Sequence, residues 1–178
     1  MKITEKIKEK SLYLHNILQE TSIEEWTIQD IVCELNIQVG HLIRAMSTSV
    51  DDYAEKNRNL KNVDDELADV LLQISVLMHI FNTPFPNYTQ PQYKVTDEVL
   101  HVMAFLSSQL LESSMRLNGK RFPQIRDENK SELQFFISRL NLIYLYIQAI
   151  CKKKNINLSD CFTDMVKSAE NFALSYKE

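Results

Sequence analysis

The sequence has little glycine and little proline, because only 2 of its 178 residues are Gly and 4 are Pro. A fold that depends on many tight turns uses these residues often, so their scarcity favours a helical bundle. No apolar run approaches the ~20 residues that a membrane-spanning helix needs, and no signal peptide is recognisable at Met1. We therefore expect a cytoplasmic all-α protein without membrane contact.

Charge and cysteine content narrow the choice of partners. The formal net charge is −4 and the acidic residues are dispersed, which argues against nucleic acid as the main partner and leaves small molecules or proteins. Cys33, Cys151 and Cys161 form no CxxC pair and lie within helical patterns. Reduced thiols in the core are therefore expected, in preference to disulfides or zinc ligands.

Apolar residues recur at the helical period along most of the chain. Ser22 and Thr27 are candidate N-caps for the second helix, and Ser159 is a candidate N-cap for the last one. Pro84, Pro86 and Pro91 exclude a helix between the two halves. The predicted helices span residues 4–20, 28–47, 63–81, 97–117, 128–154 and 160–176.

The two halves of the chain resemble each other. Each contains a long helix, a polar connector and a second long helix that begins with Glu-Leu, at Glu66 and at Glu132. Such a repeat predicts two antiparallel helical hairpins that bury a common four-helix core. We expect a single domain over residues 1–178, with a first repeat at 1–82, a proline-rich linker at 83–95 and a second repeat at 96–178.

Glu66 and Asp69 are the strongest candidates for chemistry. They lie one turn apart at the edge of an apolar helix face, so both carboxylates point the same way. A pair of this kind can share one hard divalent cation such as Mg²⁺. The alternative is that both are solvated acids in the first turn of a helix capped by Asn62, where negative charge suits the helix dipole.

These residues resemble the MazG-like all-α nucleoside triphosphate pyrophosphohydrolases, a superfamily that includes the all-α dUTPases. The stretch from Glu66 to Leu71 reads E-L-A-D-V-L and matches the family's second motif, E-L-x-D-V-L. The first motif, E-E-x-G-E-L, falls on residues 37–42, where Gly40 and Leu42 agree with it. Residues 154–158, K-N-I-N-L, resemble the G-I-D-L close of the family.

The resemblance implies cleavage of a nucleoside triphosphate to the monophosphate and pyrophosphate. In the family, four acids hold Mg²⁺, which binds the phosphates and activates a water. It implies catalytic roles for Glu66 and Asp69, and a site for Mg²⁺, or Mn²⁺, formed by these two with Gln38 and His41. Gln38 and His41 stand where the family has glutamates, so the first motif is degenerate and metal affinity should fall.

The second repeat keeps only remnants of the pattern. Gln109 and Glu112 occupy its first-motif places, and Glu132 with Phe135 occupies the second. Three further residues are candidates for substrate binding, each with a plainer alternative. Trp26 could stack on a nucleobase or could fix the start of its helix, and the basic pair at 120 and 121, namely Lys120 and Arg121, could meet phosphate or belong to an exposed loop.

Three interpretations of function remain open. The protein could be an active pyrophosphohydrolase whose site is completed by Glu34 or by Glu112. It could be a MazG-fold module that has lost catalysis, binds or supports a partner, and needs no metal. It could also be an unrelated helical bundle. An apolar face left over on such a bundle would favour a homodimer.

Overall fold

The computed structural model describes residues 3–22, 24–47, 63–86, 98–118 and 129–175, and within these ranges it contains helices and no strand. The predicted all-α helical bundle is confirmed, and each predicted helix is present within about two residues of its expected ends. The helices are α1 (Ile3–Thr21), α2 (Ile28–Met46), α3 (Val63–Ile80), α4 (Glu98–Leu117), α5 (Asn129–Lys154) and α6 (Leu158–Ser175).

Helix α3 is the centre of the bundle. It packs against α1, α2, α5 and α6, and between Glu66 and Met78 every side chain except Asp69 is buried. The sequence predicted one apolar face, but neighbours cover this helix on several sides. As a result even polar side chains such as Gln73 and Ser75 lie in the interior.

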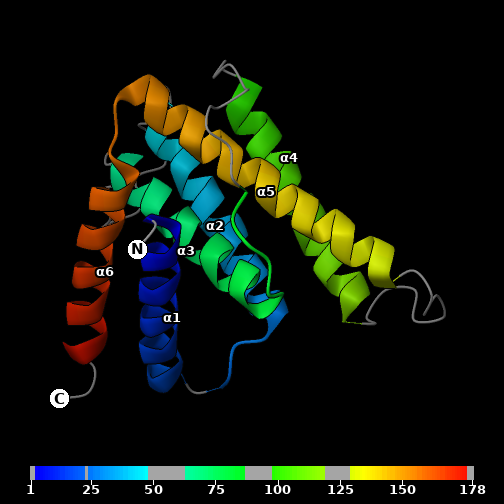
Figure 1. The fold of residues 1–178 in the computed structure, drawn as a ribbon, viewed down its shortest axis with the longest axis horizontal. Coiled ribbons are helices and arrows are strands. Elements are labelled where there is room, and N and C mark those ends of the chain that lie inside the picture. The colour runs from blue at the N-terminus through cyan, green and yellow to red at the C-terminus, as the bar shows by residue number, and fades with distance from the viewer. Residues whose placement is uncertain (1–2, 23, 48–62, 87–97, 119–128, 176–178) are drawn as a thin grey trace.

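The predicted hairpins are present. Helix α2 packs along α3, α4 packs along α5, and the two pairs are joined by contact between α2 and α4 (Figure 1). At that junction Asn36 Nδ2 donates to the carbonyl oxygens of Val32, at 2.9 Å, and Ser107, at 3.1 Å. Residues 87–97 lie outside the described part of the chain, so most of the proline-rich linker does too.

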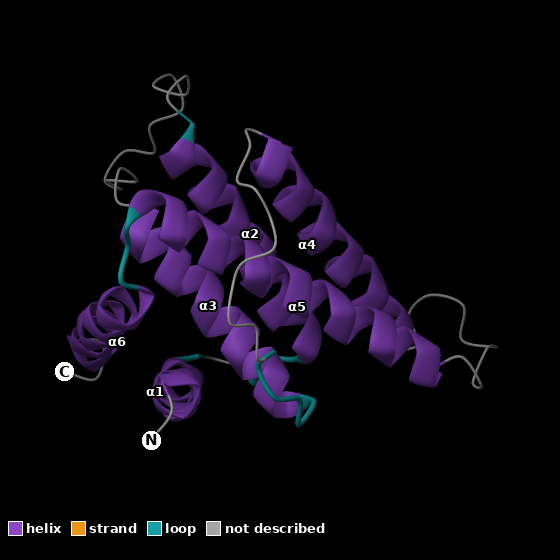
Figure 2. Ribbon diagram, turned by 45° about the horizontal axis from the view of Figure 1, so that its top comes forward, coloured by secondary structure: helices purple, strands orange, loops and turns teal. Residues whose placement is uncertain are grey.

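Helices α1 and α6 form a further pair that packs on α3. Figure 2 shows both of them nearly end-on, beside the four helices of the hairpins. Lys10 Nζ donates to Thr163 Oγ1 at 3.1 Å, and Tyr13 Oη donates to Glu170 Oε1 at 2.5 Å. These contacts join the first helix to the last and close the bundle over the face of α3 that the hairpins leave open.

Helix α5 contains an apolar segment, Ser131–Lys154, that is long and apolar enough by composition to cross a membrane. It packs on α4 and α3, and 44% of its most apolar window is buried in the bundle. Phe136, Leu140, Ile143 and Ile147 from this segment are fully buried. One face of this segment therefore belongs to the core of the bundle.

Of the predicted helix caps, Thr27 is confirmed, whereas Ser22 and Ser159 do not cap the helices expected of them. The cap of α2 is Thr27, whose hydroxyl accepts from the Asp30 amide while Asp30 accepts from the Thr27 amide, in a capping box. Ser22 instead donates to the Leu18 carbonyl and ends α1. Helix α6 begins at Leu158, and Asn157 Oδ1 accepts from the Ser159 amide, so Asn157 takes the capping role expected of Ser159.

Two helices end on asparagines in the left-handed conformation, Asn82 with φ 47° and Asn155 with φ 56°. After each of them the next amide reaches back to the last turn, Thr83 N to Met78 O at 2.8 Å and Ile156 N to Cys151 O at 2.9 Å. This is the Schellman arrangement, usually built on glycine. Asparagine tolerates the same backbone conformation, which is how a chain with so little glycine still ends its helices sharply.

Candidate functional site

The first part of the candidate site is a polar row on the flank of α2. Glu34, Gln38 and His41 follow one another a turn apart, between the buried apolar stripe and the exposed face. Gln38 Nε2 donates to Glu34 Oε1 at 2.6 Å, and Gln38 Oε1 lies 3.2 Å from His41 Nδ1. Because the Gln38 oxygen can only accept, this contact requires the proton on Nδ1 of His41.

The second part of the site comes from the first two turns of α3. Glu66 is only 6% exposed, and its Oε2 lies 3.8 Å from His41 Nδ1. The hairpin thus brings Glu66 of α3 close to His41 of α2, which in turn adjoins Gln38. Asp69 lies one turn further along α3 and is partly exposed. Glu66 is not a solvated surface acid, so the simpler alternative for this residue is excluded.

The residues fit a divalent cation only in part. The carboxylates of Glu66 and Asp69 lie one turn apart and are suitable oxygen donors for Mg²⁺. The α2 side is less suitable, because the amide of Gln38 is bound to Glu34 and its oxygen faces His41. Within the described ranges, no three His, Cys, Asp or Glu side chains are grouped so that they could hold one metal ion.

The second repeat arranges its remnants differently. Glu112 and Glu132 both contact Arg116, with Nη2 to Glu112 Oε1 at 2.8 Å and Nη1 to Glu132 Oε2 at 3.4 Å. Burial lowers the pKa of Arg116, but the charges of Glu132 and Glu112 outweigh this effect and hold that pKa above its ordinary value. Gln109 lies a turn before Glu112, and its Oε1 is buried without a hydrogen bond to the described residues.

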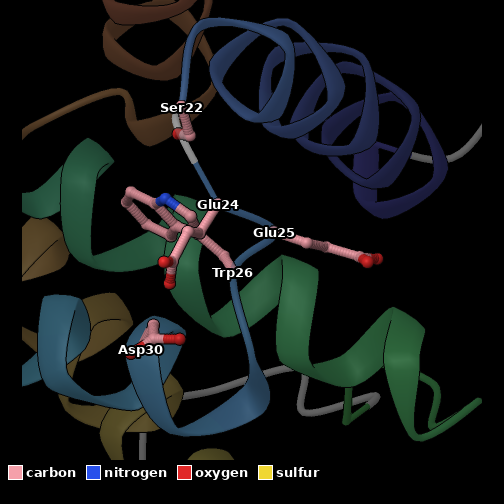
Figure 3. A pocket seen from close by; sticks show the side chains of 5 residues that line it. All are labelled: Ser22, Glu24, Glu25, Trp26 and Asp30. Carbon is pink, nitrogen blue, oxygen red and sulfur yellow. The ribbon is translucent and has the colours of Figure 1, made fainter.

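Trp26 lines a pocket at the start of α2. The pocket has a volume of about 570 Å³ and is lined by Trp26 with Ser22, Glu24, Glu25 and Asp30. Figure 3 shows that Glu25 extends away from the other four side chains. His41 follows Asp30 by eleven positions on α2, a rise of about 16 Å, so this pocket lies well away from the Glu66 carboxylate along the helix. The carboxylates of Glu24 and Asp30, which line this pocket, would repel a polyphosphate.

Not every candidate can be placed. Lys120 and Arg121 lie outside the described residues. The cysteines, all expected in the core, differ from one another: Cys151 is buried, Cys161 is partly buried and Cys33 is exposed. The expectation was therefore wrong for Cys33, because this residue lies on the outward face of α2, between buried Val32 and partly buried Glu34.

Arg116 contacts two of the predicted site residues, Glu112 and Glu132, but the sequence alone did not indicate it as a site residue. Its spacing of four residues from Glu112 is a known signal for an ion pair on one helix. Its contact with Glu132 depends on how α4 and α5 are paired and could not be found from local sequence.

Comparison of this chain with family models, with curated proteins and with solved structures gives no match.

Proposed function

We propose that the chain is a MazG-like nucleotide pyrophosphohydrolase with weak turnover, dependent on Mg²⁺ or Mn²⁺ and acting on a nucleoside triphosphate in the cytoplasm. The observation that supports this most is that the degenerate first motif and the matched second motif lie against each other across one hairpin. Glu66 of α3 is buried against His41 of α2, and Gln38 adjoins His41. These are the positions at which the resembled family places its acids.

Weak turnover follows from charge. A triphosphate and a carboxylate site repel each other unless divalent cations neutralise both. Binding these cations requires several carboxylates close together. Each missing carboxylate removes about 4 kcal/mol of attraction per unit of ion charge, for a separation of ~4 Å and an effective dielectric of ~20, before screening. Gln38 carries no charge, and imidazole suits transition metals better than Mg²⁺. Affinity for Mg²⁺ should therefore be low.

In this proposal Glu66 and Asp69 hold the cation, which when bound would neutralise phosphate charge and polarise a water. Glu34 is the third carboxylate near the site, because it accepts a hydrogen bond from Gln38. The same bond keeps the Gln38 amide turned toward Glu34, so an incoming cation has to compete with it.

A second candidate function is a catalytically degenerate MazG-fold module that binds a nucleotide or a protein, or forms a homodimer. The observation that favours it is the continuity of the row from Glu34 through Gln38 to His41. In a site with four acids, the carboxylates repel one another until a metal ion binds. Here neighbouring side chains contact one another instead, so no metal is needed to relieve such repulsion. Phe105 of α4, 60% exposed, and Ile37 of α2, 50% exposed, are apolar surface residues that a partner could cover.

The decisive experiment restores the acids. The double variant Gln38→Glu/His41→Glu should bind Mg²⁺ more tightly than the wild type and release more pyrophosphate from a panel of nucleoside triphosphates. Without metal it should melt at a lower temperature, because like charges gather beside Glu66. Added Mg²⁺ should recover that loss by binding only the folded state.

The control makes the same two changes elsewhere, as Gln134→Glu/His101→Glu at exposed positions of α5 and α4. Its melting temperature should respond to Mg²⁺ as the wild type does. Efficient Mg²⁺-dependent turnover by the wild type would show that the missing ligands have been misplaced. A double variant whose melting ignores Mg²⁺ would show that the four positions do not converge on one ion.

A further inference from the structure

The two hairpins can be compared position by position. The shift in residue number that aligns Gln38 with Gln109, and His41 with Glu112, also aligns Ala45 of α2 with Arg116 of α4. A second shift, which aligns Glu66 with Glu132, matches further positions of α3 with positions of α5. The matched positions are Glu34 with Phe105, Ala45 with Arg116, Asp69 with Phe135, and Gln73 with Arg139.

The comparison shows a difference in charge. At the matched positions the first hairpin has three carboxylates, Glu34, Glu66 and Asp69, and no Lys or Arg. The second hairpin has two carboxylates and two guanidinium groups, Arg116 and Arg139. The first site therefore has a negative excess for an external cation to neutralise, whereas the second site is internally neutral.

Arg116 lies between the carboxylates of two helices. One of its terminal nitrogens contacts Glu112 of its own helix at 2.8 Å, and the other contacts Glu132 of α5 at 3.4 Å. The Glu132 side chain is only 17% exposed, and its Oε1 is buried without a hydrogen bond to any described residue. Glu132 therefore depends on Arg116 more than a solvated acid would.

Arg139, further along α5, adds a second positive charge at the matched positions of this hairpin. Its guanidinium carbon lies 4.2 Å from the centre of the Phe135 ring, in a cation–π contact. Arg139 Nε and Gln109 Oε1 are both buried without a hydrogen bond to the described residues. The second hairpin thus has a buried donor and a buried acceptor at the positions that match Gln73 and Gln38 of the first hairpin.

We propose that Arg116 is a built-in cation that occupies the place of a divalent metal ion between Glu112 and Glu132, so that the α4–α5 hairpin binds no metal. The resemblance between the hairpins suggests the comparison, but the inference does not require turnover at the first hairpin. A guanidinium offers several N–H donors and a permanent charge, so it can contact two carboxylates at once, and because it is part of the chain it does not dissociate as a metal ion would.

The test removes the cation and keeps the side-chain volume. In Arg116→Met the carboxylates of Glu112 and Glu132 lose their shared partner. Because Arg116 and Glu112 are 40% and 45% exposed and only Glu132 is mostly buried, the melting temperature in chelator should fall by roughly 1–4 °C. Millimolar Mn²⁺ or Mg²⁺ should then restore most of that loss, because a divalent ion can now enter between the two acids. Arg116→Lys, which keeps the positive charge, should stay close to the wild type and should show no such response.

Two further variants locate the effect. Adding Glu132→Gln to Arg116→Met should abolish the response to Mn²⁺, whereas adding Glu66→Gln should leave it in place, which separates this site from the first hairpin. The proposal is overturned if Arg116→Met melts like the wild type and ignores divalent ions. It is equally overturned if the wild type shows a Mn²⁺ response that Glu132→Gln removes and Glu66→Gln does not. Failure of pyrophosphate release at the first hairpin changes neither outcome.

Discussion

His15 is the residue whose ionisation should influence stability in a predictable direction. Its ring packs edge-on against Trp26 with 6.5 Å between ring centroids, and burial lowers the pKa of His15 below its ordinary value of 6.5. Above that value both the folded and the unfolded state hold a neutral ring. As pH falls below it, the unfolded state binds the proton more readily, so this contribution to stability is lost.

We therefore expect the urea midpoint of the wild type to fall between about pH 7.5 and about pH 5.5 by more than that of His15→Gln. Fluorescence of Trp26, the single tryptophan, is a suitable local signal. His101→Gln is the control, because His101 is exposed on α4. Equal pH dependence in the wild type and His15→Gln would contradict the burial argument.

At the scale of single elements, the same substitution to alanine should have opposite effects at two positions. Gly40 lies inside α2, and a Cβ built on it meets nothing within 4 Å. Gly40→Ala should raise the free energy of unfolding by about 0.5–1 kcal/mol, because alanine loses less backbone entropy in a helix. Asn155 ends α5 with φ 56°, a conformation in which Cβ crowds the backbone.

Asn155→Ala should therefore lower the free energy of unfolding by about 1 kcal/mol, and Asn155→Gly should raise it slightly. Urea titrations of the three single variants measure both effects. Stabilisation by Asn155→Ala would mean that the helix ends without the left-handed cap.

At the scale of the whole molecule, the reactivity of the cysteine thiols shows whether the helical bundle unfolds as one unit. Cys151 lies near the end of α5, and burial, with smaller effects from the charges of Cys161 and Asp64, raises its pKa to about 12. Reaction with a thiol reagent needs the thiolate, so native Cys151 should stay unmodified near neutral pH. Cys33 is exposed and should react first.

The expected result is one fast thiol in native protein, lost in Cys33→Ser, and reaction of Cys151 only at urea concentrations that unfold the bundle. Mass spectrometry after alkylation identifies each site. Fast labelling of Cys151 in native conditions would mean that the junction of α5 and α6 opens without the rest of the molecule.

Local pattern was enough to determine the helices and the break after α3. These features depend on the helical period, on the restricted backbone of proline and on residues a few positions apart, all of which are present in any short window of sequence. The asparagine ends of α3 and α5 also depend on local chemistry. At the start of α6, two nearby residues, Asn157 and Ser159, could each serve as the cap, and which of them does so moves the helix boundary by a residue or two.

Only the tertiary structure decided which side chains became buried and which charges met. Cys33 and Cys151 both lie in helical patterns, yet one is exposed and the other is in the core. Gln73 and Ser75 are interior because α1 and α6 cover α3, a consequence of packing between opposite ends of the chain. Arg116 meets Glu132, and His41 meets Glu66, across hairpins. Such contacts depend on how whole helices are oriented against each other, and that orientation is set by burial of the shared core rather than by local sequence.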